Sequence, residues 1–203
     1  MARLHREIMQ ELLSRIAGGT YAVGAMLPKE ERLAEELDVS RGVVRECIRA
    51  LEERGVVRVR HGRGATVLPA RAWNVLDPAV FAAVHDAPGG RRLVAEAAEA
   101  RAIVLGHAAA LAAERGRPDG IRALTAAVEA IETAPDDARP AAEREFERAL
   151  VDAAGNRPLA RVAAALAEVG APVGGASYRP VLEAVVRGDG VVARGAMESL
   201  LRR

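Results

Sequence analysis

The stretch LPKEERLAEELDVSRGVVRE, residues 27–46, decides the fold of the N-terminal part of this chain. Residues 30–37 are expected to form a short helix, because their apolar side chains recur at helical spacing on one face. Residues 38–40 then make a tight connection, in which Ser40 is a good N-cap for a second helix over residues 41–54. Two short helices joined by such a turn form the helix-turn-helix pattern.

The second helix of this pair carries a ridge of arginines. Arg41, Arg45 and Arg49 are four residues apart and therefore lie on one face, whereas Val44 and Ile48 belong to an apolar stripe that also contains Cys47 and Leu51. Guanidinium groups at a helix N-terminus suit phosphates and the O6 and N7 acceptors of guanine. A ridge of this kind alone is more often a solvated helix face. In the helix-turn-helix context it predicts a recognition helix.

The flanking sequence completes a winged helix-turn-helix over residues 1–69. Residues 4–16 have an apolar residue at every fourth position, which predicts an amphipathic helix. After Gly55 the period changes to two, so residues 57–60 and 65–68 are expected to pair as a β-hairpin whose valines alternate with arginines. The turn between them, His61-Gly62-Arg63-Gly64, is a basic tip that could lie along a DNA groove.

Composition limits the class of protein. The chain has 203 residues, 50% of them hydrophobic, a net charge of +1 and a single cysteine. A disulfide framework and a cysteine-rich metal site are excluded, and no run of 18 apolar residues predicts a membrane span. The first residues mix charged with apolar side chains, so we expect no signal peptide and a cytoplasmic protein. The near-neutral total conceals a basic segment, residues 39–69, which contains seven arginines and only three acidic residues.

The C-terminal part is predicted to be a helical bundle. Residues 70–80 are expected to be a linker, and residues 81–203 an all-helical effector-binding and dimerisation domain. Proline and glycine separate its predicted helices, and a glycine- and alanine-rich loop is expected at 170–176. The helices are expected at residues 92–115, 120–133, 140–154, 158–169 and 178–202, the last broken near 188–190. The predicted fold is therefore mainly α.

Residues 4–68 closely resemble the GntR family of bacterial transcription regulators, through the stretch 27–46 and the segments ALEERGVV (residues 50–57) and HGRGATV (residues 61–67). The resemblance implies a homodimer on a short palindromic operator, with the recognition helix in the major groove and the wing tip in the minor groove. Carried over by position, and with Arg63 added from the basic tip, the DNA-contact candidates are Ser40, Arg41, Gly42, Val43, Arg45, Arg49, His61, Gly62 and Arg63. Glu31 departs from the family, which often has arginine there, and Gly42 and Val43 replace side chains that relatives often use.

The helical part is similar to the FCD-type effector domain of the FadR-like subgroup. The resemblance implies a pocket in which an aspartate and three histidines bind a divalent metal that helps to hold a carboxylate effector. Here Glu143, Glu147, Tyr178 and Leu200 occupy those four positions, so no metal is expected. The two glutamates either bind Mg²⁺ or Ca²⁺ through their carboxylates or form a solvated or ion-paired face. Arg101 matches a family arginine that can pair with an acidic effector, or else is an ordinary surface arginine.

Two functions remain open from the sequence, and a third is disfavoured. The first is a transcription regulator, expected to be a repressor, whose operator binding responds to a small carboxylate effector through Arg101, Glu143, Glu147 and Tyr178. The alternative is a DNA-binding regulator whose C-terminal domain serves only dimerisation and binds neither ligand nor metal. An enzyme is not expected, because the chain has no P-loop, no Gly-x-Ser-x-Gly and no His-Glu-x-x-His motif.

Overall fold

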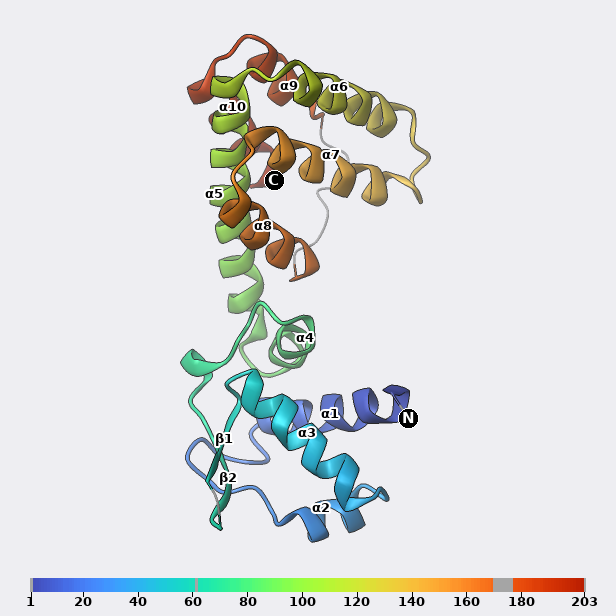
Figure 1. Ribbon diagram of the computed structural model, residues 1–203, viewed down its shortest axis with the longest axis vertical. Helices are drawn as coiled ribbons and strands as arrows, with labels where there is room; N and C mark the ends of the chain where they lie inside the picture. The colour runs from blue at the N-terminus through green and yellow to red at the C-terminus, as the bar shows by residue number, and fades with distance from the viewer. Residues whose placement is uncertain (1, 61, 170–176, 203) are drawn as a thin grey trace. The chain divides into compact units, whose positions relative to one another are not determined.

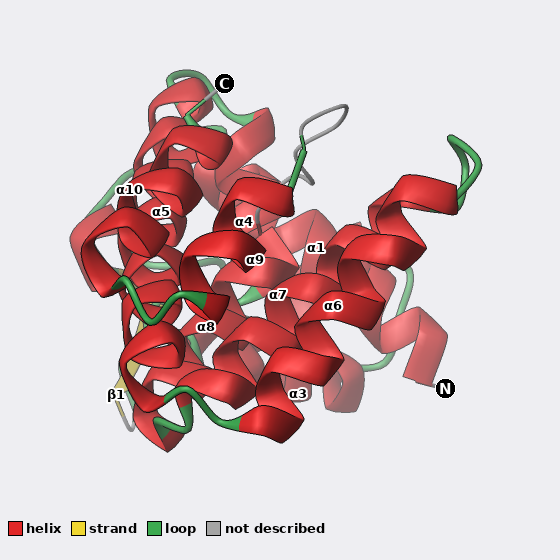
Figure 2. Cartoon of the chain, turned by 90° about the horizontal axis from the view of Figure 1, so that it is seen from above, coloured by secondary structure: helices red, strands yellow, loops and turns green. Residues whose placement is uncertain are grey.

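The computed structural model describes residues 2–60, 62–169 and 177–202, with the side chains of residues 2 and 3 left aside. The described residues form ten α-helices, one short 3-10 helix and two strands, and the chain divides into two compact units, Met1–Leu93 and Val94–Arg203 (Figure 1). Helices dominate the molecule, as Figure 2 shows. The prediction of a mainly α protein, with a winged helix-turn-helix followed by a helical bundle, is confirmed.

Three helices build the centre of the first unit: α1 (Ala2–Ala17), α2 (Glu30–Glu36) and α3 (Arg41–Glu53). Both α1 and α2 pack against α3. The interior is aliphatic, and its fully buried side chains include Leu12, Leu13, Leu33, Val44 and Leu51. The Oγ atom of Ser40 accepts a hydrogen bond from the backbone N–H of Val43 at 3.3 Å, so Ser40 is the N-cap of α3, as its residue type predicts.

The wing consists of β1 (Val57–Arg60) and β2 (Gly64–Val67), which pair antiparallel with Val57 opposite Val67. The two valines of β1 differ in burial, because Val57 is 1% exposed but Val59 is 39% exposed. The hairpin extends past the core towards its tip, so a side chain near its end has no apolar partner to cover it. The backbone N–H of Val59 donates to the Glu52 carboxylate at 2.8 Å, which ties β1 to α3.

The first unit extends beyond the predicted boundary at residue 69. A 3-10 helix, η1 (Ala70–Ala72), leads to α4 (Pro78–Asp86), whose Val80 and Ala83 are buried in the same core as α1. Asp77 caps α4 and pairs with Arg54 at the end of α3, at 3.0 Å. The stretch 70–80, predicted to be a linker, is thus held against the winged helix by packing and an ion pair, and α4 groups with the first unit rather than the second.

Gly55 marks the tightest approach in this unit and gives a stability prediction. Its φ is +70°, and a Cβ atom there would lie 2.3 Å from the carbonyl oxygen of Ala72. We expect Gly55→Ala to lower the free energy of unfolding of the first unit by at least about 2 kcal/mol, because the left-handed conformation and the clash both oppose a side chain. Gly19, with φ +85° and no atom near its Cβ position, is the matched control.

Urea denaturation followed by circular dichroism measures both variants. Gly19→Ala is expected to cost only about 1 kcal/mol, because it adds the backbone strain alone. Equal losses in the two variants would contradict the close approach of Gly55 to Ala72.

The second unit is a helical bundle built mostly from alanine, valine and leucine. Its helices are α5 (Gly90–Arg115), whose first four residues are counted with the first unit, α6 (Pro118–Thr133), α7 (Arg139–Ala154), α8 (Arg157–Val169), α9 (Arg179–Val186) and α10 (Gly190–Leu201). Helix α6 packs on α7 and α9, α7 on α8, and α9 on α10, around a core that contains Leu124, Phe146, Leu150 and Met197. The predicted helical segments match these elements. The predicted interruption of the last helix lies between α9 and α10, where Gly188 has φ +72°. The predicted loop at 170–176 lies outside the described residues.

In the part of the chain that the structure describes, no helix combines the length and the apolar character needed to cross a bilayer.

Candidate nucleic-acid interface and effector site

The arginine ridge of α3 lies on the exposed face of the helix. Val44 and Leu51 are fully buried, while the side chains of Arg41, Arg45 and Arg49 are 66%, 57% and 63% exposed. The packing of α3 on α1 and α2 therefore leaves the three predicted arginines together on one ridge. Cys47, on the buried face, is 0% exposed, and burial raises the pKa of its thiol to about 11, so it is a core residue rather than a nucleophile.

Each arginine of the ridge is paired with a carboxylate. Both the Nε and the Nη2 of Arg45 donate to Glu30 Oε2, at 3.0 and 2.9 Å. Arg41 Nη1 lies 3.2 Å from Glu31 Oε1, and Arg49 Nη1 lies 2.8 Å from Glu46 Oε1. The hydrogen bond to Glu30 also raises the pKa of Arg45. Exposed pairs with a single hydrogen bond, as at Arg41 and Arg49, are worth about 0–1 kcal/mol, so DNA phosphates or bases can replace these two glutamates at little cost.

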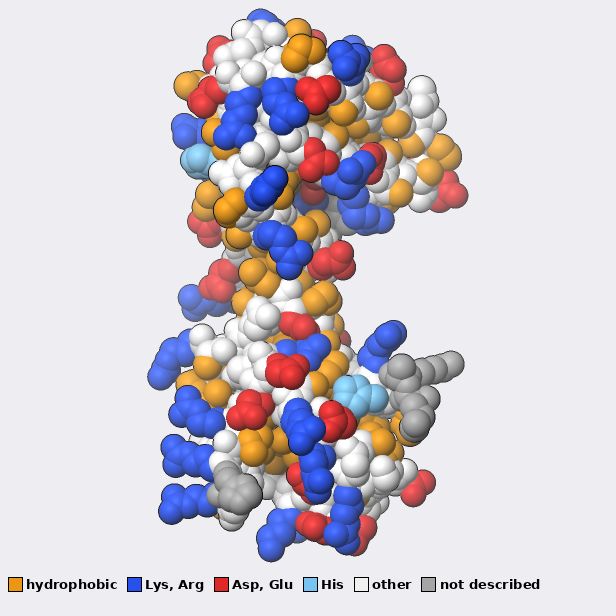
Figure 3. All heavy atoms as spheres, viewed as in Figure 1, with side chains coloured by type: hydrophobic (Ala, Val, Ile, Leu, Met, Phe, Trp, Pro, Cys, Tyr) orange, Lys and Arg blue, Asp and Glu red, His pale blue; other side chains and the backbone are white. Residues whose placement is uncertain are grey.

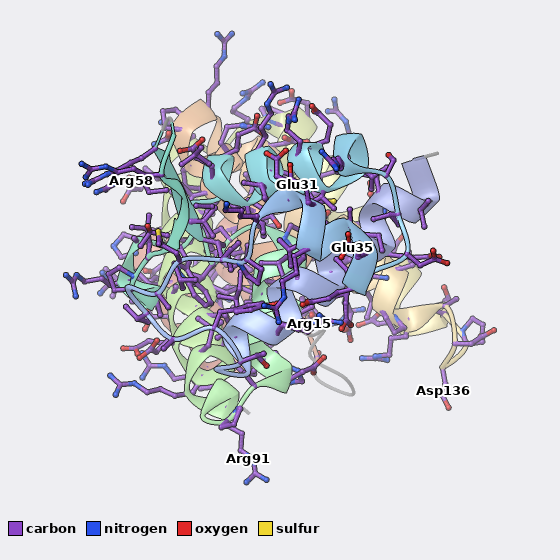
Figure 4. The ribbon with its side chains drawn as sticks, turned by 90° about the horizontal axis from the view of Figure 1, so that it is seen from below. Arg15, Glu31, Glu35, Arg58, Arg91 and Asp136 are labelled. Carbon is purple, nitrogen blue, oxygen red and sulfur yellow. The ribbon has the colours of Figure 1, made fainter. Side chains whose placement is uncertain are left out.

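Glu31, the residue that departs from the family pattern, lies on α2 beside α3 (Figure 4). Its carboxylate forms the ion pair with Arg41, so it does not stand alone as a charge that repels phosphate. Sequence reasoning identified the altered position but missed this partner, which is ten residues away in the chain and reaches Glu31 only because α2 packs on α3.

The other candidates at the start of α3 differ in what they present. Ser40 uses its hydroxyl oxygen to cap the helix. Gly42 is exposed, and the nearest atom to its Cβ position is Ser40 Oγ at 3.7 Å, so the backbone is open to a close approach. Val43 is half-buried against the core of the unit. The N-terminal turn of α3 therefore offers backbone groups and a methyl surface rather than additional polar side chains.

The wing carries more positive charge than the predicted tip. Gly62 has φ +72°, and Arg63 is exposed, whereas the predicted contact His61 lies outside the described residues. Arg58 and Arg60 are also exposed on β1, and Arg58 points outward from the hairpin in Figure 4. Neither was among the predicted contacts, although their alternation with Val57 and Val59 places both on one face of the strand. Figure 3 shows basic side chains along the wing and among acidic ones over α2 and α3.

The four candidate effector residues of the second unit come together in its interior. Arg101 of α5 forms an ion pair with Glu147 of α7, and these side chains are only 8% and 6% exposed. Glu143, one turn before Glu147, accepts from Arg139 Nε at 3.2 Å. Tyr178, 2% exposed, precedes α9 and packs edge-to-face on Phe146, with ring centroids 4.8 Å apart. The reading of Arg101 as a surface residue is therefore wrong, because α7 covers it, and the two glutamates form a buried ion-paired face rather than a solvated one.

Burial in this cluster raises the pKa of two of its acidic groups. Burial raises the pKa of Glu147, and the charge of Arg101 opposes that rise without overcoming it. Burial also raises the pKa of Tyr178, and the nearby charges of Glu143 and Glu147 raise it further. The hydroxyl of Tyr178 and the Oε2 of Glu143 are buried without a hydrogen-bond partner among the described residues. Tyr178 is thus a neutral donor beside two carboxylates.

The residues at the family's metal positions do not fit a divalent cation. Glu143 and Glu147 are already paired with arginines, so positive guanidinium groups lie where a cation would need to be. Tyr178 is a poor ligand because its pKa is raised, and Leu200 has no donor atom. Among the described residues no group of three or more histidine, cysteine, aspartate or glutamate side chains could hold a metal ion.

A groove beside this cluster has the size of a small-molecule site. It lies between α5, α7 and α8 and has a volume of about 360 Å³, within the usual range for ligand pockets. Glu147 and Arg144 line it on one side, and alanines of α8, including Ala160 and Ala163, on the other. Glu147 therefore belongs both to the buried ion pair and to the wall of the groove.

Two family models match the chain. Residues 4–67 match the bacterial regulatory proteins of the gntR family, and residues 96–203 match the FCD domain. An HTH-type transcriptional regulator of Mycobacterium tuberculosis is 34% identical over 158 residues, which are 77% of this chain and 64% of that protein. The galactonate operon transcriptional repressor of Escherichia coli is 33% identical over 60% of this chain and 53% of its own length. The chain thus spans between about half and two thirds of these relatives.

Solved structures agree with these matches. A GntR protein of Streptococcus agalactiae is 26% identical with a TM-score of 0.51, covering 98% of this chain and 97% of that one. Lar of Listeria monocytogenes, 19% identical, shares the fold with a TM-score of 0.60 over 98% of this chain and 93% of its own. The matched families are those of transcription regulators and not of enzymes. The chain belongs to the gntR family of bacterial regulatory proteins, in the group whose C-terminal part is an FCD domain.

Proposed function

We propose that this chain is a cytoplasmic, homodimeric repressor that binds a palindromic DNA operator through α3 and the β1–β2 wing. The observation that carries the proposal is the exposed ridge of Arg41, Arg45 and Arg49 on an N-capped helix whose opposite face is buried. Such a helix fits the major groove, where arginine forks match the O6 and N7 of guanine. The exposed arginines of the wing add charge for the phosphate backbone.

The proposed binding to a palindromic operator is tested in two ways. Duplexes are selected from a random library with the purified chain, and the DNA upstream of its own gene is footprinted. We expect an enriched palindrome with half-sites about one helical turn apart, bound by a dimer whose mass is measured by light scattering. Enrichment of no sequence, or binding by a monomer to a single half-site, would contradict the proposal.

For the second unit we propose a small-molecule effector in the groove between α5, α7 and α8. The groove has room for a small organic acid, and Arg101, the cation suited to a carboxylate, lies behind Glu147 at its wall. Such a ligand would take the place of Glu147 on Arg101 and would need no divalent metal. Binding that favours one dimer geometry over another would then change operator affinity.

The second candidate is a unit that serves only dimerisation. It is favoured by the same ion pair, because Arg101 already has the Glu147 carboxylate as an internal partner. Thermal-shift measurements with a panel of small organic acids distinguish the two, with Glu147→Gln as a second protein that weakens the internal competitor. A ligand that stabilises the wild type, and Glu147→Gln more strongly, supports the effector. No shift in either protein supports dimerisation alone.

A further inference from the structure

The Glu30–Arg45 pair differs from the other two pairs of the ridge. Glu30 precedes the buried Leu33 and Ala34 by three and four residues, so it lies on the side of α2 that faces α3. Its side chain is 32% exposed, less than the 50% of Glu31 and the 58% of Glu46. Arg45 also donates two hydrogen bonds to it, whereas Arg41 and Arg49 each donate one to their glutamates.

The two hydrogen bonds fix the orientation of the Arg45 guanidinium. A guanidinium has five N–H groups in a rigid planar fork, and Glu30 accepts from the Nε–H and from one N–H of Nη2. The remaining N–H groups are those at the end of the fork, which is the part that can donate to two acceptors on a base edge. An arginine held in this way loses less rotamer freedom when it binds than a freely moving one.

From this geometry we infer that Glu30 is a positioning residue that sets the sequence discrimination of Arg45. The inference rests on the proposed function, because it assumes that α3 reads an operator. Glu30 holds the guanidinium side-on, so that the end of the fork presents a pair of donors to a guanine in the major groove. Glu30 itself contacts no base and acts only through Arg45.

Glu30 can affect DNA binding in two ways, by orienting Arg45 or by repelling phosphates with its own charge, and the two ways have different effects on sequence discrimination. A carboxylate near the ridge repels the phosphates of every DNA sequence to the same extent. Orienting Arg45 helps only the sequence that places a guanine in front of it. Loss of Glu30 should therefore weaken discrimination between operator and other DNA, while loss of a charge elsewhere on α2 should leave discrimination unchanged.

Glu35 provides the matched charge control. It lies on the same helix and is exposed, and Figure 4 shows its side chain apart from that of Glu31. Glu30→Gln and Glu35→Gln change the net charge equally. The probes are the duplex that the wild-type chain enriches from a random library and a shuffled duplex of the same length and composition. The dissociation constants of both duplexes are measured by fluorescence anisotropy at one salt concentration.

We expect Glu30→Gln to lower the ratio of affinities for the enriched and shuffled duplexes about tenfold, the loss of one well-held arginine–guanine contact. Glu35→Gln should leave that ratio unchanged. Glu30→Asp keeps the charge but shortens the side chain, and it should lower the ratio without strengthening binding to the shuffled duplex. In a chain that already carries Arg45→Lys, which lacks the fork, Glu30→Gln should have no further effect on the ratio.

Three results would overturn the inference while leaving the proposed function intact: an unchanged ratio in Glu30→Gln, equal changes in Glu30→Gln and Glu35→Gln, or an undiminished effect of Glu30→Gln in the Arg45→Lys background. Failure of the wild type to enrich any sequence would overturn the proposed function and the inference with it. Because the Glu30–Arg45 pair is exposed, the melting temperatures of all these variants should stay close to that of the wild type.

Discussion

Replacing both Arg45 and Arg49 with alanine is expected to weaken binding to the selected operator at least about 100-fold, because each arginine of a recognition helix contributes about 1–3 kcal/mol to discrimination. Both side chains are more than half exposed, and their ion pairs with Glu30 and Glu46 are surface pairs, so the fold does not depend on them. The measurement is a fluorescence anisotropy titration with the operator duplex, repeated at two salt concentrations.

Loss of two cations should also make the affinity less sensitive to salt, because fewer counterions are released from the DNA. The charge-matched control is the pair Arg157→Ala and Arg161→Ala, two exposed arginines on α8 in the second unit. This control should bind the operator within a few-fold of the wild type. If the Arg45 and Arg49 variant bound as well as the control, α3 would not be the recognition helix.

The second large effect is expected inside the helical bundle, where Arg101→Leu should destabilise the second unit by about 3–5 kcal/mol. The change leaves Glu147 buried, 6% exposed, without its ion-pair partner, and removing one member of a buried pair costs far more than the pair itself contributes. Urea denaturation followed by circular dichroism gives the free energy of unfolding. Arg148→Ala, which removes an exposed pair with Glu145 on the same helix as Glu147, should cost less than about 1 kcal/mol.

The pH dependence of this loss has a definite sign. Burial already raises the pKa of Glu147, and removal of Arg101 takes away the charge that opposes that rise. A carboxyl group whose pKa is higher in the folded than in the unfolded state binds its proton on folding, so stability is lost as the pH rises through the folded pKa. The deficit of Arg101→Leu should therefore be smaller near pH 5 than at pH 8.

A double variant completes the test of the buried pair. Arg101→Leu combined with Glu147→Leu removes both charges and should recover most of the lost stability, because an apolar pair in a buried position needs no desolvation of ions. If Arg101→Leu cost no more than Arg148→Ala, or if the double variant were as unstable as the single one, the burial of the pair would not control the stability of the unit.

The arginine ridge could be predicted from the sequence, because a spacing of four residues in a helix fixes which side chains share a face. Its carboxylate partners could not. Glu30 is fifteen residues from Arg45 in the chain, and the two meet only through the angle at which α2 packs on α3. The arginines of β1 were visible in the alternating pattern of the sequence. That Val59 is exposed as well, and that the end of the hairpin therefore lies outside the core, could be seen only in the structure.

For the four candidate effector residues, too, the sequence predicted one part and the tertiary structure decided the other. The resemblance to the FCD domain placed Arg101, Glu143, Glu147 and Tyr178 at one site, and the structure brings them together. Whether Arg101 is buried or exposed could not be decided from α5 itself, because alanine and other apolar residues are spread around this helix and form no clear apolar stripe.

The sequence by itself determined the local features of this protein: the capped recognition helix, the arginine ridge, the hairpin and the succession of Ala-rich helices. These follow from neighbours within a few residues, through helical and strand periodicity and capping. Only the tertiary structure decided that residues 70–86 pack with the winged helix, that Glu30 accepts hydrogen bonds from Arg45, and that Glu147 forms a buried ion pair with Arg101. Each of these depends on contacts between segments distant in the chain, where burial and ion pairing are set by packing rather than by sequence spacing.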